Sequence, residues 1–214
     1  MKATGTYERG EKQMGKINKI TKQTENRFLN MYELDREDKA GRSGKYFVAS
    51  RAVEVEALKM STKRVNPDGI IIYSICGDKV VLIRQYRYPL DGYIYEFPAG
   101  LVDEGENMMA AGIREMKEET GLTLDPIPVD EAYSKPYFTS IGMSDEACGT
   151  VYGYASGEIT QKYQEESEEI EIVLADKAEV RRILKEENVA IMCAYMLMHF
   201  LEDEEPFHFL KKQL

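Results

Sequence analysis

The stretch from Gly100 to Leu122, GLVDEGENMMAAGIREMKEETGL, constrains this chain more than any other. Its second half is rich in good helix formers and ends at Gly121, where a left-handed glycine cap is typical. Glu115, Glu118 and Glu119 then stand at positions i, i+3 and i+4, so three carboxylates share one face of the predicted helix. Crowded like charges destabilise a helix unless a cation joins them, and hard oxygen ligands suit Mg²⁺ or Mn²⁺.

An acidic helix face is usually only solvated, so the neighbouring residues decide between the two interpretations. Arg114 directly precedes the cluster and can hold a carboxylate in a fixed pose through a bidentate pair. The segment Phe97-Pro98-Ala99-Gly100 predicts a sharp turn between a strand over residues 92–96 and the helix. Such a turn can present backbone carbonyls to the same ion. These features favour a divalent metal site.

The spacing of these residues resembles the Nudix box, GX5EX7REUXEEXGU, in which U is apolar. Every fixed position is present, and Met116 and Leu122 fill the apolar positions. The resemblance implies an α/β fold, the Nudix α/β/α sandwich around a mixed β-sheet. It also implies hydrolysis of a nucleoside diphosphate linked to another moiety, with a divalent metal ion on the box helix.

The resemblance also assigns roles to the matching positions. Glu115, Glu118 and Glu119 become metal ligands, and the carbonyl of Ala99 is a further candidate. Arg114, Glu115 and Glu119 are predicted to be catalytic through this cluster. Gly100 forms the turn and borders the substrate. The implied cofactor is Mg²⁺, with Mn²⁺ as an alternative.

The flanking segments resemble the ADP-ribose pyrophosphatase branch of the family. A QYR segment ends at Arg87 and leads to an EFPAG turn that begins at Glu96, and both residues are expected to contact the substrate. The alternative for Arg87 is a surface arginine stacked on a neighbouring tyrosine. Arg51 and Ser144 are further candidate substrate contacts, although Ile141, near Ser144, stands where the branch usually has proline.

An acidic run over residues 164–171, QEESEEIE, occupies the place where this branch carries a glutamate proposed as the catalytic base. Glu166 and Glu168 are the two best matches. Glu165 and Glu169 have the same chemistry, so the sequence leaves the choice open. The alternative is a solvated acidic loop.

Length and charge bound the remaining possibilities. A chain of 214 residues can bury one full core, so we expect a flexible arm over residues 1–23, a β-strand extension over 24–64 and a hydrolase domain over 65–214. The formal net charge of −10 argues against nucleic-acid and membrane-surface binding. The branch implies that the N-terminal extension forms a homodimer.

Two further features concern the compartment and the C-terminal region. The three cysteines lie far apart without a CxxC motif, which predicts neither a zinc site nor a disulfide framework. We therefore expect a reduced, cytoplasmic protein. The nearly apolar stretch over residues 189–200 is too short to span a bilayer and predicts a buried core helix.

The predicted function is metal-dependent cleavage of a small-molecule nucleoside diphosphate sugar, in first place ADP-ribose to AMP and ribose 5-phosphate. One alternative is another Nudix activity, on UDP-sugars, other nucleotide sugars or dinucleoside polyphosphates. A second alternative is a non-catalytic module that senses ADP-ribose. Such modules commonly lose carboxylates of the box, whereas this chain keeps all of them.

Overall fold

The chain divides into two compact units, one formed by Met1–Arg64 with Thr139–Glu146 and the other by Val65–Phe138 with Ala147–Leu214. The computed structural model describes residues 15–165 and 169–211. Each unit is taken in turn.

The second unit is built on a mixed eight-stranded sheet. Its main path runs β11-β5-β4-β10-β8, while β6 pairs with β5, β7 with β4 and β9 with β10. The pairing of β10 with β4 is parallel and the others are antiparallel. The strands are β4 (Gly69–Cys76), β5 (Lys79–Arg87), β6 (Gly92–Glu96), β7 (Ala99–Leu101), β8 (Thr123–Pro126), β9 (Tyr137–Phe138), β10 (Ala147–Ser156) and β11 (Ile170–Ala175).

Strands β4 and β5 form a hairpin, but they separate soon after its turn. Gly77 adopts a positive φ of 65° in the turn, and only Ile75–Val80 and Cys76–Lys79 pair across the hairpin. Beyond this point β5 pairs with β6 and β4 pairs with β7. The chain therefore crosses from one strand of the hairpin to the other between Glu96 and Ala99, directly before the box.

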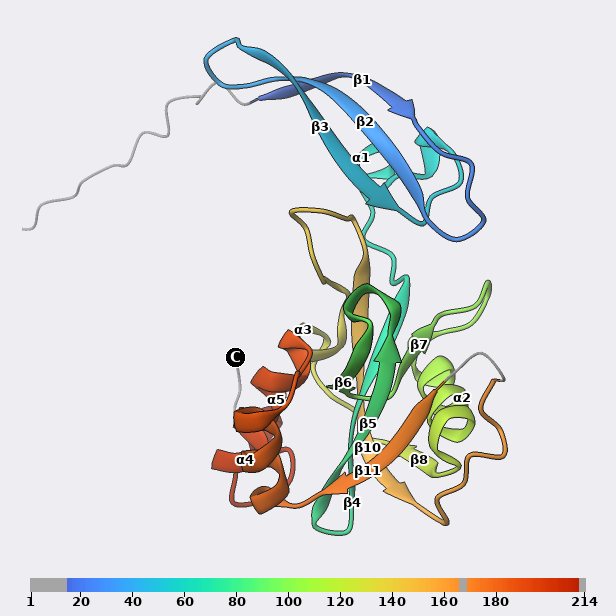
Figure 1. Ribbon diagram of the computed structural model, residues 1–214, viewed down its shortest axis with the longest axis vertical. Coiled ribbons are helices and arrows are strands. Elements are labelled where there is room, and N and C mark those ends of the chain that lie inside the picture. The colour runs from blue at the N-terminus through green and yellow to red at the C-terminus, as the bar shows by residue number, and fades with distance from the viewer. Residues whose placement is uncertain (1–14, 166–168, 212–214) are drawn as a thin grey trace, which may run out of the picture. The chain divides into compact units, whose positions relative to one another are not determined.

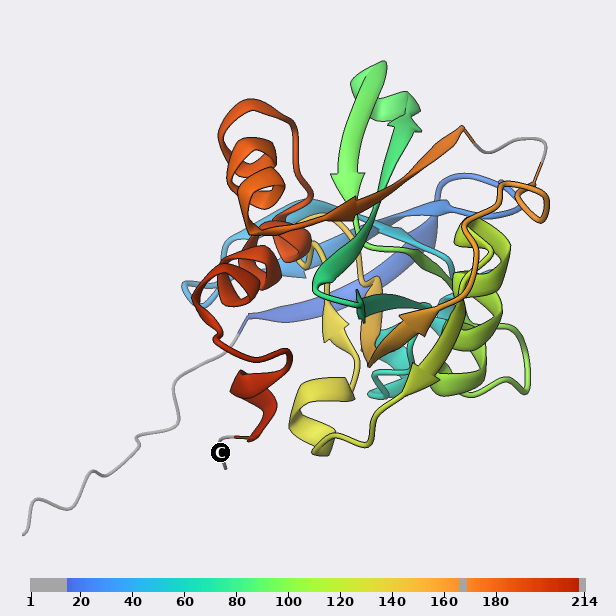
Figure 2. The same cartoon turned by 90° about the horizontal axis from the view of Figure 1, so that it is seen from below.

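Helices cover both faces of this sheet (Figures 1 and 2). Helix α2 (Met108–Thr120) lies on one face, where Met116 packs with Ile72 and Val81. Helices α4 (Lys177–Glu186) and α5 (Ile191–Glu202) lie on the other face. Side chains alternate along a strand, so neighbouring residues of β4 and β5 serve opposite cores. These layers confirm the predicted α/β/α sandwich around a mixed sheet.

Helix α5 corrects one expectation. Cys193, Leu197 and Phe200 are buried on its inner side, but Ile191 and Tyr195 are 64% and 62% exposed. The prediction of a buried core helix is wrong for this outer side, because the helix lies in an outer layer and packs through one face only. An all-apolar sequence gives no periodicity from which that face can be identified.

The second unit also contains three short elements among its described residues. They are η2 (Tyr88–Leu90), α3 (Glu131–Ser134) and η3 (His208–Lys211). Within the part of the chain that the structure describes, no helix combines the length and the hydropathy needed to cross a membrane.

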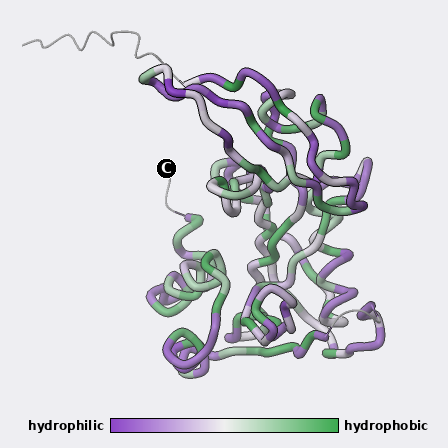
Figure 3. The backbone as a smooth tube through the Cα atoms, turned by 45° about the horizontal axis from the view of Figure 1, so that its top comes forward, coloured by the Kyte–Doolittle hydropathy of each residue, from purple (hydrophilic) through white to green (hydrophobic). Residues whose placement is uncertain are grey.

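The first unit contains the N-terminal β extension. Strands β1 (Lys16–Lys22), β2 (Asn30–Glu37) and β3 (Ser43–Ser50) form an antiparallel sheet in that order, followed by η1 (Val55–Ala57) and α1 (Lys59–Thr62). Much of β1 and β2 is hydrophilic (Figure 3). The flexible arm predicted over residues 1–23 is wrong at its end, because Lys16–Lys22 form a strand. The other domain boundaries stay predictions.

Candidate active site

Helix α2 is specified by both of its ends. The side chain of Asn107 caps the N-terminus by accepting a hydrogen bond from the Ala110 amide at 2.9 Å. Gly121 ends the helix with a positive φ of 76°, a conformation that glycine adopts without a steric penalty. The predicted helix is confirmed, and Glu115, Glu118 and Glu119 lie in its last two turns.

Two of these glutamates meet strand β7 at adjacent residues. Glu119 is 3% exposed, and its Oε2 accepts a hydrogen bond from the Ala99 amide at 3.1 Å. The carboxyl group of Glu115 lies against Gly100, where a Cβ atom would stand 1.9 Å from the Glu115 Cδ. Only glycine at position 100 leaves room for that carboxyl group. The Ala99–Gly100 turn therefore brings two of the predicted metal ligands together.

Arg114 binds three glutamates at once. Its Nη1 donates to Glu115 Oε1 at 2.7 Å and to Glu118 Oε2 at 3.1 Å, while Nε and Nη2 donate to the carboxylate of Glu106 at 3.2 and 2.9 Å. Nη2 also donates to the carbonyl of Leu101 at 3.0 Å. The guanidinium therefore joins the helix to the loop before it, as the box pattern predicts for a residue that orients the cluster.

This network shifts the pKa values of Glu106 and Arg114. The hydrogen bond from Arg114 lowers the pKa of the Glu106 carboxyl below its usual range. The glutamates, Glu106 first, raise the pKa of the Arg114 guanidinium, which remains charged at every physiological pH. A permanent positive charge thus lies within the acidic cluster.

The chemistry of the donors fits a hard divalent cation. The convergent groups are carboxylates, whose hard oxygens are the ligand type that Mg²⁺ and Mn²⁺ prefer. Among residues 15–165 and 169–211, no group of three or more His, Cys, Asp or Glu side chains is arranged as a ready ligand set. Arg114 accounts for the lack of such a set, because Glu115 and Glu118 are turned towards its guanidinium.

Arg87 and Glu96 are brought together by the sheet. Arg87 Nε donates to Glu96 Oε2 at 2.9 Å, and Nη2 binds the same oxygen. Val81 packs on the α2 side of the sheet, and side chains two residues apart in a strand share a face, so Ile83 and Arg87 lie on that side too. Glu96 pairs directly with Ile83 and therefore lies on the same face. Both predicted substrate contacts therefore share the sheet face of helix α2, and Arg87 is an ion-pair partner of Glu96.

Arg51 and Ser144 lie in the first unit. Ser144 forms a parallel bridge with Ala49, near the C-terminal end of β3. The side chain of Arg51 donates twice to Glu146 Oε1, at 3.1 and 3.0 Å. The structure thus places these two predicted contacts close to each other, at the turn formed by residues 139–146.

The two best candidates for the catalytic base, Glu166 and Glu168, lie outside the described residues. Glu169 is described: its side chain accepts a hydrogen bond from the Tyr93 hydroxyl, and its carbonyl accepts one from the Tyr86 amide at 3.1 Å. On the other side of the run, Gln161 and Gln164 bind backbone carbonyls of β11 and α2. Sequence reasoning missed these glutamines, because their partners are set by the tertiary fold alone.

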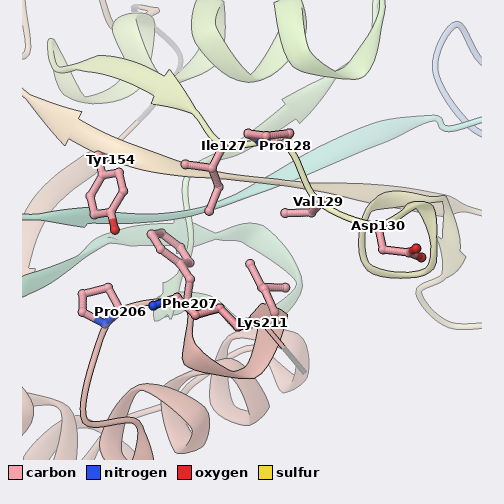
Figure 4. Close-up of a pocket in the computed structure, with 9 residues that line it drawn as sticks. Ile127, Pro128, Val129, Asp130, Tyr154, Pro206, Phe207 and Lys211 are labelled. Carbon is pink, nitrogen blue, oxygen red and sulfur yellow. The ribbon is translucent and has the colours of Figure 1, made fainter. Parts of the chain in front are cut away.

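Two cavities in the second unit help to delimit the site. One, of about 280 Å³, adjoins the end of β5 and is lined by Gln85, Tyr86, Arg87, Tyr88, Pro89 and Glu169. The other, of about 340 Å³, is shown in Figure 4 and lies between the loop after β8 and the C-terminal turn. Phe207, which lines this second cavity, packs in the core of α4 and α5, so the cavity lies on the face opposite α2.

Comparison with known proteins agrees with this geometry. The chain is 50% identical over 83 residues to the ADP-ribose pyrophosphatase of Saccharomyces cerevisiae, which covers 36% of each protein. It is 31% identical over 97 residues to the ADP-ribose pyrophosphatase of Bacillus subtilis, which covers 44% of this chain and 50% of that one. The chain therefore matches half or less of these relatives' length.

The fold and the family are both recognised. A crystal structure of an ADP compounds hydrolase superposes with a TM-score of 0.67 over 88% of this chain and 95% of the other, at 20% identity, a likeness of fold. The model of the NUDIX domain matches residues 65–194, more than half of the chain. The resemblance stated from the box residues is confirmed, and the chain belongs to the NUDIX domain family.

Proposed function

We propose that this protein hydrolyses the diphosphate bond of a nucleoside diphosphate sugar, and that ADP-ribose is the substrate, with AMP and ribose 5-phosphate as products. The observation that carries the proposal is the meeting of Glu115 and Glu119 with adjacent residues of the Ala99–Gly100 turn. The names of the relatives from yeast and Bacillus support the choice of substrate.

Hydrolases of this family generally use divalent metal ions. In this protein we assign Mg²⁺ to Glu115, Glu118, Glu119 and the carbonyl of Ala99, with Mn²⁺ as the alternative. When bound, the metal neutralises charge on the diphosphate and lowers the pKa of a coordinated water. The Ala99 amide holds the Glu119 carboxylate in place for this task.

Arg114 has a positioning role in this proposal. Its bonds to Glu106 and to the Leu101 carbonyl anchor it independently of the ligands. It can therefore keep Glu115 and Glu118 oriented while they bind the ion. The proton of the attacking water passes to a glutamate of the acidic run, Glu166 or Glu168 by the resemblance.

Arg87 and Glu96 are proposed as substrate contacts on the sheet face of helix α2. The guanidinium of Arg87 donates two hydrogen bonds to Glu96, and the side chain is 45% exposed, so its remaining N–H groups can bind diphosphate oxygens. Glu96 fixes the direction of that arginine and can accept hydrogen bonds from ribose hydroxyls. Arg51 and Ser144 are proposed as further contacts from the first unit.

We also propose a homodimer formed through the three-stranded sheet. Met31 and Phe47 are 39% and 53% exposed, and their pairing partners, Ala49 and Glu33, show that both lie on one face of the sheet. Phe28 and Leu29, directly before β2, are also exposed. A group of apolar side chains on one sheet face is typical of an interaction surface.

A substrate panel tests the proposal against its alternatives. The purified protein is incubated with ADP-ribose, UDP-glucose or diadenosine polyphosphate, in Mg²⁺ or with EDTA, and the products are separated by anion-exchange chromatography. We expect AMP and ribose 5-phosphate from ADP-ribose in Mg²⁺ only. Faster cleavage of UDP-glucose or the dinucleotide would identify another substrate. Binding of ADP-ribose without turnover in calorimetry would identify a sensing module.

A further inference from the structure

Gln85, on strand β5, is a buried side chain with an unsatisfied polar atom. It is 8% exposed, and its Oε1 accepts no hydrogen bond within the part of the chain that the structure describes. Among the same residues, the Ser74 hydroxyl is the other buried side-chain atom of this kind. A buried acceptor without a donor lowers the stability of the fold, and native proteins keep few of them. An acceptor retained at such a cost is typical of a binding site.

The sheet explains why the protein supplies no donor nearby. Strand β5 pairs with β6 on one side and β11 on the other, and the residues opposite Gln85 are Ile94 and Ile170. Directly paired residues place their side chains on the same face of a sheet. The carboxamide of Gln85 therefore lies between two aliphatic side chains, which have no N–H or O–H group to offer.

Gln85 lines a cavity next to the proposed substrate contacts. It borders the cavity of about 280 Å³ at the end of β5 together with Arg87, which donates two hydrogen bonds to Glu96. Gln85 and Arg87 are two residues apart on one face of the strand, so their Cα atoms lie about 6.6 Å apart. Sites for whole small molecules usually measure about 300–1,000 Å³. This cavity therefore suits one part of a nucleotide rather than all of it.

The chemistry of the unpaired atom limits which part of a nucleotide can bind it. Gln85 Oε1 only accepts hydrogen bonds, so the oxygens of a diphosphate, which are acceptors too, cannot satisfy it. A sugar hydroxyl can donate to Oε1 and at the same time accept from Nε2. The amine of adenine also donates, but it lies beyond the ribose. The short spacing between Gln85 and Arg87 favours the hydroxyls, which lie closer to the phosphates.

We infer that Gln85 is a specificity-determining residue, whose carboxamide binds a sugar hydroxyl of a substrate whose diphosphate is held by Arg87. The inference rests on the proposed function, because the sugar reaches this cavity as part of the nucleoside diphosphate sugar. The residue then selects substrates in which a hydroxylated ring directly follows the phosphates.

The test uses Gln85→Met, which keeps the length of the side chain and removes the acceptor, in the full chain. We expect KM for ADP-ribose to rise about three- to tenfold, the contribution of one neutral hydrogen bond to affinity. The bond forms equally in the ground and transition states, so kcat should stay within about twofold. Tm should equal that of wild type or exceed it, because an apolar group replaces an unsatisfied acceptor.

Four ligands that are parts or analogues of the substrate identify the hydroxyl. Their affinities are measured by calorimetry in EDTA, where the proposed hydrolysis stops. Pyrophosphate carries no sugar, so its affinity should be the same in Gln85→Met and wild type. A loss of affinity for ribose 5-phosphate assigns the contact to the distal sugar. An equal loss for ADP and IDP assigns it to the ribose of the nucleoside, because IDP lacks the amine of adenine.

Ser74→Ala is the matched control for the buried acceptor. Ser74 is fully buried on β4, near the turn of the β4–β5 hairpin, and its hydroxyl is also unsatisfied among the described residues. It lines neither of the two cavities described above. Ser74→Ala should therefore keep or raise Tm, as Gln85→Met does, but leave KM and all four affinities unchanged.

The outcomes separate this inference from the proposed function. Unchanged KM and affinities in Gln85→Met overturn the inference alone, and a lower Tm in that case assigns the carboxamide to a structural water. Parallel losses that include pyrophosphate, or a loss for ADP without one for IDP, also overturn it. A wild type that binds these ligands but cleaves nothing in the substrate panel refutes the proposed function, while calorimetry still decides the role of Gln85. A wild type that binds none of them refutes both.

Discussion

The substitution Gly100→Ala separates the chemistry of the site from the stability of the fold. Gly100 does not have a positive φ, so alanine is compatible with its backbone conformation. The new Cβ would stand 1.9 Å from the Glu115 Cδ, whereas two carbon atoms in contact lie about 3.5–4 Å apart. The carboxyl group of Glu115 must therefore move by about 1.5–2 Å, away from the Ala99–Gly100 turn.

We expect that movement to lower kcat much more than it lowers the stability of the fold. The displaced group is the end of a flexible side chain, so we expect a stability loss below about 1 kcal/mol and a Tm within about 4 °C of wild type. A ligand displaced by more than 1 Å should lower kcat about a hundredfold. Initial rates with ADP-ribose over a series of Mg²⁺ concentrations, together with thermal unfolding, measure both effects.

A matched glycine variant supplies the control. A Cβ at Gly142 would meet no atom within 4 Å, so Gly142→Ala should keep both kcat and Tm. Wild-type kcat in Gly100→Ala would refute the reasoning, because the position of the Glu115 carboxyl against this turn would then have no part in the chemistry. A Tm loss well above 4 °C would refute the separation of site and fold.

Three further predictions follow from the same contacts. Glu119→Gln keeps an oxygen for the Ala99 amide but removes the charge, so kcat should fall by about a hundredfold or more with little change in circular dichroism; turnover equal to wild type in Mg²⁺ would exclude Glu119 as a ligand. The lowered pKa of Glu106 contributes stability that is complete above the ordinary glutamate value of 4.5 and is lost as the pH falls below it, so Glu106→Gln should show a smaller drop in Tm between pH 6 and pH 3 than wild type; equal drops would show that this carboxyl does not contribute. Phe47→Lys places a charge on the exposed sheet face and should halve the mass measured by light scattering if that face forms the dimer; a dimeric mass in this variant would locate the interface elsewhere.

The local parts of the site were predictable from sequence. A helix with a glycine cap and glutamates at i, i+3 and i+4 is specified within a few residues, and the structure forms it as Met108–Thr120. The partners of these glutamates were less accessible. That Glu115 lies against Gly100 depends on how β7 pairs with β4, a register that no local pattern determines.

Other features depend on contacts between distant segments. The pairing of Arg87 with Glu96 requires the register of β5 and β6, which places both on one face. The bond from Gln164 to Glu119 joins residues 45 positions apart, and neither residue type indicates it. The lysines of β1 are typical of a solvated segment and favour a flexible arm, whereas pairing with β2 makes these residues a strand.

The hydrogen bonds from Arg114 to three glutamates have a consequence for how the proposed metal ion would bind. Three acidic side chains already have a cation of the chain's own beside them, so the fold has no need of a metal to relieve their repulsion. We therefore expect the chain to fold without the metal ion and to bind the ion afterwards, unlike small zinc domains, which fold only when their ion is bound. Binding of the proposed ion would then add a partner to Glu115 and Glu118, which Arg114 already orients, in a reversible step that follows the free concentration of the ion.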